Sequence, residues 1–230
     1  MVLICGIDDA GREFNWLLIS PIGPVIGPMI MAGVLIEEYD LDKLKTLGVK
    51  DSKLLTQNKR EELYKEIIKI VKDYKIIKIY PEEIDNALFS DTSNLNNLEG
   101  EKMAEIINYL KPEKVIVDCP STNKKAFTDF LNKRMKVKTE ILCEHKADFL
   151  FCEVSAASIL AKCAREEEME VMRKKLGIEC GSGYPADPVT KEFLKNNWEK
   201  YPEIFRKSWS SYLEYSGGKR SKKQLTLGEF

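Results

Sequence analysis

The chain alternates short apolar runs with longer amphipathic stretches, and two of the apolar runs end on aspartate. Apolar runs that predict buried strands lie at residues 2–7, 24–36, 75–80, 114–118 and 137–143. Stretches with helical spacing of apolar residues lie at 56–71, 95–110, 124–134 and 154–176. This alternation indicates an α/β domain, in which we expect the first two strands to pair and helices to flank the sheet.

The balance of charges excludes some classes of protein. The chain has 230 residues, with 36 Lys and Arg against 37 Asp and Glu, and 43% of its residues are hydrophobic. This length suits one domain with a buried core. The near-neutral total argues against a disordered polyelectrolyte and against a uniformly basic coat for nucleic acid, although it leaves room for a local basic stripe.

The cysteines and the apolar runs bear on the cellular compartment. The six cysteines form no C-x-x-C pair, so we expect reduced thiols, several of them buried. The first residues lack the positive region of a signal peptide, and no apolar run approaches the ~20 residues that span a bilayer. We therefore expect a cytoplasmic protein with no membrane partner.

Two of the predicted strands end on aspartates, one at Asp8 and Asp9 and the other at Asp118. Carboxylates at the tips of adjacent strands repel one another unless protons or cations neutralise them. Such oxygen ligands suit Mg²⁺ or Mn²⁺, and two ions about 4 Å apart can promote hydrolysis of a phosphodiester. The alternative is that these aspartates are ordinary turn formers.

Several blocks, in family order, resemble the motifs of type 2 ribonuclease H (ribonuclease HII) in its archaeal form. They are GIDDAGR at 6–12, GPVIGPM at 23–29, KDSKL at 50–54, Asp118 at a strand end, EHKAD at 144–148 with VSAASILAK at 154–162, and GSGYPADP at 181–188. Another nuclease or recombinase of the same fold is an alternative, but such a protein would share the acids and not these blocks.

The resemblance implies a fold and an activity. The fold is a ribonuclease-H-like mixed sheet flanked by helices: a catalytic domain at 1–176, a helical C-terminal extension at 177–215 and a flexible tail at 216–230. The activity is cleavage of the RNA strand of RNA/DNA hybrids, and 5′ to ribonucleotides embedded in duplex DNA, with two divalent ions. The products carry 3′-hydroxyl and 5′-phosphate ends, which suits ribonucleotide removal in replication or repair.

The resemblance also assigns site residues. Asp8 is the bridging metal ligand, with Asp9, Asp118 and Asp148 completing the metal shells; Asp148 is placed by the family match alone. Glycines of a split Gly-Arg-Gly loop would read the ribose 2′-hydroxyl through the backbone. The expected substrate contacts are Gly11, Arg12, Gly23, Lys50, Ser52, Lys53, Lys146 and Tyr184.

Three single residues need separate interpretation. His145 is the only histidine, and its place in the family block favours a structural role over that of general base. The family has Glu where this chain has Asp9, which predicts an altered metal preference or a lower rate. Glu153 replaces the usual proline; we favour a solvated carboxylate at a helix start over an extra acid near the metals.

A ten-residue insertion, residues 13–22, separates Arg12 from Gly23. If it loops out, Gly23 can still stand beside Arg12; if it extends the hairpin, recognition of the 2′-hydroxyl is weakened. The second case leads to an alternative function, a clamp-tethered hybrid-binding protein with weak or no activity.

The C-terminal sequence carries two further features. Residues 206–223 hold six Lys or Arg against Glu214 alone, which predicts a stripe facing the substrate and salt-sensitive binding. QLTLGEF at 224–230 resembles the peptide that docks on the sliding clamp PCNA, with Gln224, Leu227 and Phe230 at the matching positions. The alternative is a frayed tail.

Overall fold

A central mixed sheet of five strands organises the chain, in the order β5-β4-β1-β6-β7. The computed structural model describes residues 1–12, 14–15, 20–21, 23–49 and 55–218. The strands span β1 Leu3–Ala10, β4 Met29–Glu37, β5 Asp73–Ile79, β6 Lys114–Asp118 and β7 Glu140–Glu144. β1, β6 and β7 are parallel neighbours, and β4 pairs antiparallel with both β1 and β5. The predicted α/β class and the pairing of the first two strands are confirmed.

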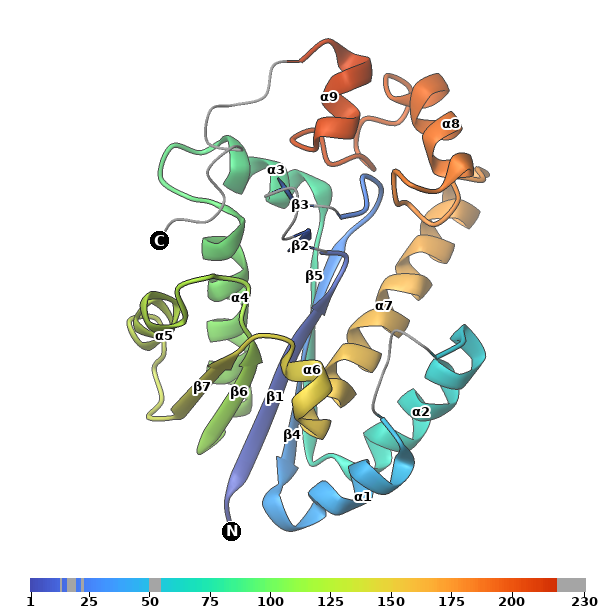
Figure 1. The fold of residues 1–230 in the computed structure, drawn as a ribbon. Helices are drawn as coiled ribbons and strands as arrows, with labels where there is room; N and C mark the ends of the chain where they lie inside the picture. The colour runs from blue at the N-terminus through green and yellow to red at the C-terminus, as the bar shows by residue number, and fades with distance from the viewer. Residues whose placement is uncertain (13, 16–19, 22, 50–54, 219–230) are drawn as a thin grey trace.

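Helices cover both faces of this sheet (Figure 1). On one face lie α3 Pro81–Phe89, α4 Leu95–Leu110 and α5 Lys124–Asn132, and on the other lie α1 Leu41–Leu47, α2 Gln57–Ile70, α6 Ala147–Leu150 and α7 Cys152–Leu176. α8 Pro188–Asn197 and α9 Ser210–Ser216 form the helical C-terminal region, at the top of Figure 1. A separate short pair, β2 Phe14–Asn15 and β3 Ser20–Pro21, belongs to the insertion.

Alternate residues of β1 face opposite layers. Cys5 and Ile7 pack in the core beneath α4, together with Ile106 and Ile107. Ala10 packs in the second core with small residues of α7 such as Ala157. Successive strand residues point to opposite faces, so Asp8 and Asp9 are also sent to opposite faces of the sheet.

β1 is longer than the sequence predicts. The apolar run stops at Ile7, but pairing with β4 continues through Asp8 and Asp9 to Ala10, opposite Ile30. The strand therefore ends three residues later than predicted, with the aspartates within its last three residues, because the partner strand supplies the hydrogen bonds that extend it. The two carboxylates are held on rigid strand backbone.

Gly6 allows α7 to approach β1 closely. A Cβ at Gly6 would lie 2.3 Å from the carbonyl carbon of Glu153 and 2.5 Å from the backbone nitrogen of Val154. Only a residue without a side chain fits there. Because Asp8 follows on the same face, this contact also fixes the distance between Asp8 and α7.

Local signals placed several helices correctly. The Thr56 side chain accepts the N–H of Lys59 at 3.3 Å and caps α2, and Asn94 caps α4 in the same way. α4 and β6 have the predicted bounds. The predictions contained no α1, α3 or α6, and placed the starts of β7 and α7 a few residues from their positions.

The six cysteines are free thiols, and all except Cys163 are buried, as predicted. Within the described ranges, no helix combines the length and apolar character needed to cross a membrane.

Candidate active site

Asp8 and Asp118 occupy neighbouring parallel strands. The register pairs Ile7 of β1 with Val117 of β6, so the two aspartates are the next residues along each strand. The Asp8 Oδ1 accepts the N–H of Asp9 at 2.8 Å, and the Asp118 Oδ1 accepts the N–H of Ala147 at 2.9 Å. This second bond ties β6 to the start of α6.

Asp148 reaches the same region from α6. It is 8% exposed and Asp8 is 5% exposed. Burial raises the pKa of Asp8 well above its usual value, and the charges of Asp118, Asp9 and Asp148 raise it further, while a hydrogen bond from Ser158 opposes the shift. The other three predicted acids are thus all within electrostatic reach of Asp8.

Asp9 has a partly buried carboxylate among mixed charges. Burial raises its pKa to about 6; Arg12 opposes this, Asp118 adds to it, and Lys162 and Arg206 also oppose it. Its Oδ2 atom is buried with no hydrogen-bond partner among the described residues. A buried carboxylate oxygen in this condition is suited to accept a cation.

The chemistry of these donors fits hard divalent cations, which prefer carboxylate oxygen. Among the residues that the structure describes, however, no three His, Cys, Asp or Glu side chains stand close enough together to hold one ion. Mg²⁺ is usually bound by one or two carboxylates together with water and substrate phosphates. The arrangement therefore suits ions whose coordination is completed by the substrate rather than by a closed protein cage.

The Arg12 side chain is directed toward α4. Its guanidinium forms an ion pair with Glu99 and donates to the Asn96 Oδ1 at 2.8 Å, and both side chains of the ion pair are almost fully buried. The main chain, rather than the side chain, is thus the part of residue 12 that is left for a ligand. Sequence reasoning missed Asn96 and Glu99, although two polar residues three apart on an otherwise apolar helix face were a usable signal.

The two residues that flank the insertion region, Gly11 and Gly23, lie close together. A Cβ at Gly23 would lie 3.3 Å from the Gly11 carbonyl oxygen. The pairing of β1 with β4 stops at Ala10 and Ile30, and the β2–β3 pair is separate from the main sheet. Of the two arrangements that the sequence left open, the structure has the one in which Gly11 and Gly23 are neighbours.

The segment around Tyr184 joins this loop. The Gly183 carbonyl accepts the N–H of Val25 at 2.8 Å, and the half-buried Tyr184 ring has the Arg165 guanidinium 5.2 Å from its centroid. Arg165 was not singled out from the sequence. The structure therefore brings Gly11, Gly23 and Tyr184 to one region through residues far apart in the chain.

Lys146 and His145 flank the acids. Lys146 is exposed and adopts a positive φ of 55° immediately before α6. The His145 Nδ1 lies 3.2 Å from the carbonyl oxygen of Cys119, which follows Asp118. This contact with backbone agrees with the structural role expected for His145.

Two expectations are wrong. Glu153 is buried, not solvated: it lies beside Cys152, whose Sγ donates to its Oε2 at 3.4 Å. Arg206 was counted in the substrate-facing basic stripe but is fully buried, because its guanidinium binds backbone carbonyls inside the domain. Lys50, Ser52, Lys53, Gln224, Leu227 and Phe230 lie outside the described residues.

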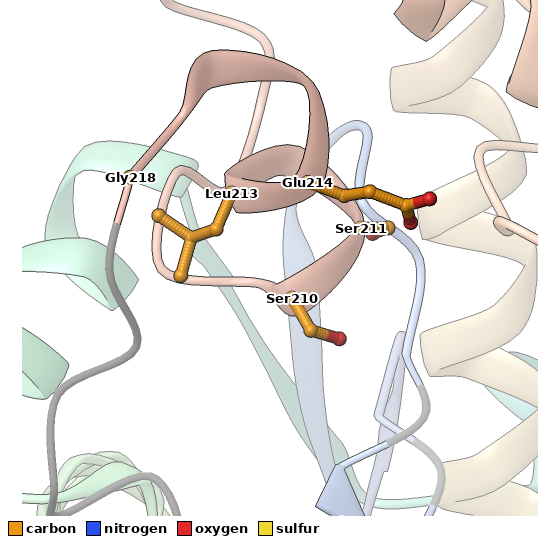
Figure 2. Close-up of a pocket in the computed structure, with 5 residues that line it drawn as sticks. All are labelled: Ser210, Ser211, Leu213, Glu214 and Gly218. Carbon is orange, nitrogen blue, oxygen red and sulfur yellow. The ribbon is translucent and has the colours of Figure 1, made fainter.

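An open depression of about 390 Å³ lies on α9 (Figure 2). Ser210, Ser211, Leu213, Glu214 and Gly218 line it. Among the described residues that line it, Glu214 is the one ionisable side chain, and none of the four acids is among them. It therefore does not form part of the candidate active site.

Comparisons with known proteins agree with the sequence motifs. The family model described as "Ribonuclease HII" matches residues 5–212. The ribonuclease HII of Pyrococcus furiosus is 41% identical over 233 residues, covering 99% of this chain and 97% of that protein. The ribonuclease HII of Methanococcus maripaludis strain C7 is 44% identical over 217 residues, covering 91% and 85%.

Solved structures agree as well. Ribonuclease H2 from Pyrococcus horikoshii OT3 is similar at a TM-score of 0.81 and 38% identity, covering 94% of this chain and 97% of that one. The PCNA:RNase HII complex from Archaeoglobus fulgidus matches at a TM-score of 0.79 and 38% identity, covering 91% and 96%. Bst-RNase HIII in complex with Mn²⁺ shares the fold at a TM-score of 0.75 and 17% identity, covering 94% and 70%.

Proposed function

Because the chain belongs to the ribonuclease HII family, we propose that it cuts 5′ to ribonucleotides embedded in duplex DNA as well as within the RNA strand of RNA/DNA hybrids. The ribonuclease H activity itself follows from the family. The proposal adds the embedded-ribonucleotide substrate, the use of two divalent ions and the products, a 3′-hydroxyl and a 5′-phosphate. A place in ribonucleotide removal during replication or repair follows from that substrate.

The observation that carries the proposal is the electrostatic coupling of Asp8 with Asp118, Asp9 and Asp148. Asp8, whose pKa is raised by burial and by the charges of the three other acids, needs positive charge nearby to be ionised at neutral pH. Clustering carboxylates in this way is unfavourable and serves no purpose in a purely structural role. It is expected at a site that binds divalent ions and a phosphodiester.

Each acid has a defined part in this proposal. Asp8, on the backbone of β1, would be the ligand shared by the two ions, and Asp9, Asp118 and Asp148 would complete the two metal shells. Mg²⁺ or Mn²⁺, when bound, lowers the pKa of water and stabilises the leaving oxygen of a phosphodiester. The hydrogen bond from the Ala147 N–H to the Asp118 Oδ1, at 2.9 Å, orients this carboxylate at the start of α6.

Recognition of ribose is assigned to Gly11, Arg12 and Gly23, here called the ribose-reading loop. Gly11 has a φ of +97°, and a Cβ there would meet the Pro28 carbonyl oxygen at 3.0 Å. The positive φ and the nearby carbonyl therefore make glycine the residue that fits at this position of the loop. A backbone group that hydrogen-bonds the 2′-hydroxyl would distinguish RNA from DNA without reading the base.

The remaining substrate contacts are assigned to side chains around the acids. Tyr184 would stack at the junction between RNA and DNA, and the Arg165 guanidinium lies 5.2 Å from the centre of its ring. Lys50, Ser52, Lys53 and Lys146 would contact backbone phosphates, which add affinity but little sequence information. Binding should consequently weaken as the salt concentration rises.

Cleavage assays on three end-labelled duplexes test this function: one with a single embedded ribonucleotide, one RNA/DNA hybrid and one all-DNA duplex. We expect Mg²⁺- or Mn²⁺-dependent cleavage of the first two, with a 5′-phosphate on the downstream product. Asp8→Asn serves as the inactive control. Cleavage of the hybrid alone would contradict the embedded-ribonucleotide substrate, and cleavage of the all-DNA duplex would contradict ribose recognition.

Clamp binding is a separate part of the proposal. The similar Archaeoglobus fulgidus protein was solved as a PCNA:RNase HII complex, and residues 224–230 carry the expected Gln, Leu and Phe spacing. We expect a chain truncated after Lys223 to lose binding to PCNA while keeping basal cleavage. Retained binding, measured by calorimetry against the full chain, would contradict the assignment to this peptide.

The alternative of an inactive hybrid-binding protein gains no support. It depends on an interrupted ribose-reading loop, whereas Gly11 and Gly23 lie together. The comparisons also relate this chain to ribonucleases over nearly its whole length.

A further inference from the structure

The insertion poses a physical problem for the ribose-reading loop. Ten residues separate Arg12 from Gly23 in sequence, yet a Cβ on Gly23 would lie only 3.3 Å from the Gly11 carbonyl oxygen. Holding two chain segments together across a loop costs conformational entropy, which contacts elsewhere must offset. The residues that make those contacts determine whether the loop keeps its shape.

Arg206 binds both sides of the insertion. Its Nη1 donates to the Gly11 carbonyl at 2.7 Å, and its Nε donates to the Gly27 carbonyl at 3.1 Å. Its side chain is fully buried, and burial lowers its pKa to about 9, so it remains charged at neutral pH. One planar guanidinium thus connects a residue before the insertion with a residue after it.

Trp209 binds the first residue after the insertion, Gly23. Its Nε1 donates to the Gly23 carbonyl at 3.2 Å, and the Arg206 guanidinium carbon lies 4.9 Å from the centre of the indole ring. Backbone bonds reinforce this arrangement: the Arg206 N–H donates to the Val25 carbonyl, and the Trp209 N–H donates to the Arg206 carbonyl. Segment 204–209 therefore lies along the whole flank that follows the insertion.

We propose that Arg206 and Trp209, here called the clasp, are positioning residues for ribose recognition that keep Gly11 and Gly23 side by side across the insertion. This inference rests on the proposed role of the ribose-reading loop. The clasp binds backbone carbonyls of that loop. It would therefore affect the reaction indirectly, by fixing the positions of Gly11 and Gly23.

A positioning role predicts a particular kinetic pattern. Phosphate contacts supply most of the affinity for the duplex, so KM should change little when the clasp is weakened. Misplacement of a substrate group by ~1 Å costs on the order of 10²-fold in rate, so kcat should fall. A variant that merely lowers the folded fraction would instead reduce activity in step with its thermal stability.

Two substitutions weaken the clasp with little change in volume. Trp209→Phe removes the indole N–H but keeps an aromatic ring, and Arg206→Lys keeps the charge but cannot bridge two carbonyls with a planar group. Trp198→Phe is the matched control, because Trp198 packs edge-on against Tyr212 in the same helical region. On a duplex with one ribonucleotide we expect about 10- to 100-fold lower kcat for both clasp variants, and less than about 3-fold for Trp198→Phe.

The sharpest test repeats Trp209→Phe in a chain from which residues 13–22 are deleted. In that protein a peptide bond joins Arg12 to Gly23. Gly23 is then held beside Arg12 by the chain itself, without the hydrogen bond from Trp209. We expect the deletion protein to cleave, and Trp209→Phe to cost it less than about 3-fold, so that the two changes are strongly non-additive. Equal losses in both backgrounds would overturn the inference, and so would a folded deletion protein without activity.

Two further readouts keep the inference falsifiable. If the deletion protein does not fold, the full-length chain decides: unchanged kcat in Trp209→Phe, or a loss that follows its melting temperature, overturns the clasp. Failure of the proposed function looks different, because the wild type and Trp198→Phe would then cleave no ribonucleotide-containing duplex.

Discussion

Asp8 and Asp118 are the next residues beyond the paired Ile7 and Val117 of two parallel strands. Their separation is therefore set by sheet geometry rather than by loop conformation. Each already accepts one backbone N–H, from Asp9 and Ala147 respectively. The acids that matter most for the proposed chemistry are held by the most rigid part of the fold.

Asp118→Asn should remove most activity, whereas His145→Asn should not. The amide keeps the volume and can still accept the Ala147 N–H, but it loses the negative charge that a cation needs. Charge stabilisation by a bound metal is worth several kcal/mol, so we expect a loss of roughly 10²- to 10⁴-fold in kcat. His145→Asn retains a donor near the Nδ1 position and should cost less than about 10-fold. Comparable losses in single-turnover assays of the two variants would refute the structural role of His145.

Asp9→Asn should stabilise the metal-free protein at neutral pH. The pKa of Asp9 is raised from 3.8 to about 6 in the folded state, so between these values the folded chain binds more protons than the unfolded chain. The unfolding free energy therefore falls as pH rises through this window, and at pH 7 the penalty is fully present. Removing it should stabilise the variant by about 1–3 kcal/mol at pH 7.

Thermal melts in EDTA at pH 4 and pH 7 measure this effect. We expect the advantage of Asp9→Asn to be small at the lower pH and to appear at the higher pH. Saturating Mn²⁺ should raise the melting temperature of the wild type more than that of the variant, because the cation binds the folded state. A variant that is less stable than the wild type at pH 7 in EDTA would contradict the assigned cause of the shift.

Asp9→Glu should change which metal supports activity. Asp is one methylene shorter than Glu, and Mg²⁺ tolerates little departure from ~2.0–2.1 Å octahedral distances. We expect the wild type to be more active with Mn²⁺ than with Mg²⁺, and Asp9→Glu to raise the activity with Mg²⁺ relative to that with Mn²⁺. Identical ratios of kcat for the two metals in both proteins would count against this interpretation.

Gly6→Ala should destabilise the fold severely. The new Cβ would sit 2.3–2.5 Å from backbone atoms of Glu153 and Val154, and backbone cannot move aside without shifting α7. We expect a loss of about 3 kcal/mol or more in the unfolding free energy, measured by urea titration. Gly177→Ala is the matched control: nothing lies within 4 Å of its Cβ position, so only the backbone strain of a positive φ, about 1 kcal/mol, remains. Equal effects of the two changes would show that the close approach of α7 to β1 is not limiting.

Sequence patterns predicted the parts of the fold that depend on local signals. α4 could be bounded because Asn94 caps its start and Pro112 follows its end, and β6 because a β-branched run stops at Asp118. The place of Asp8 inside β1 could not be read in the same way. It depends on hydrogen bonds from β4, which lies beyond the insertion.

The candidate site shows the same division. The four acids could be named from the sequence, although Asp148 was found only through the family motif. Arg206 was misinterpreted as a surface charge, because its burial depends on the carbonyls of Gly11 and Gly27, about 180 or more residues earlier in the chain. No local pattern encodes a contact of that range.

The backbone bonds between residues 23–27 and 204–209 also have a consequence for the order of synthesis. During translation, the ribose-reading loop leaves the ribosome among the first segments of the chain, but the residues that close it emerge among the last. A nascent chain that ends after α7 already contains all four acids and still lacks the partners of Gly11, Gly23 and Gly27. With the roles proposed for the ribose-reading loop and the clasp, selectivity for ribose would be completed only when the C-terminal helices have docked, and a working nuclease would appear only once the domain is whole.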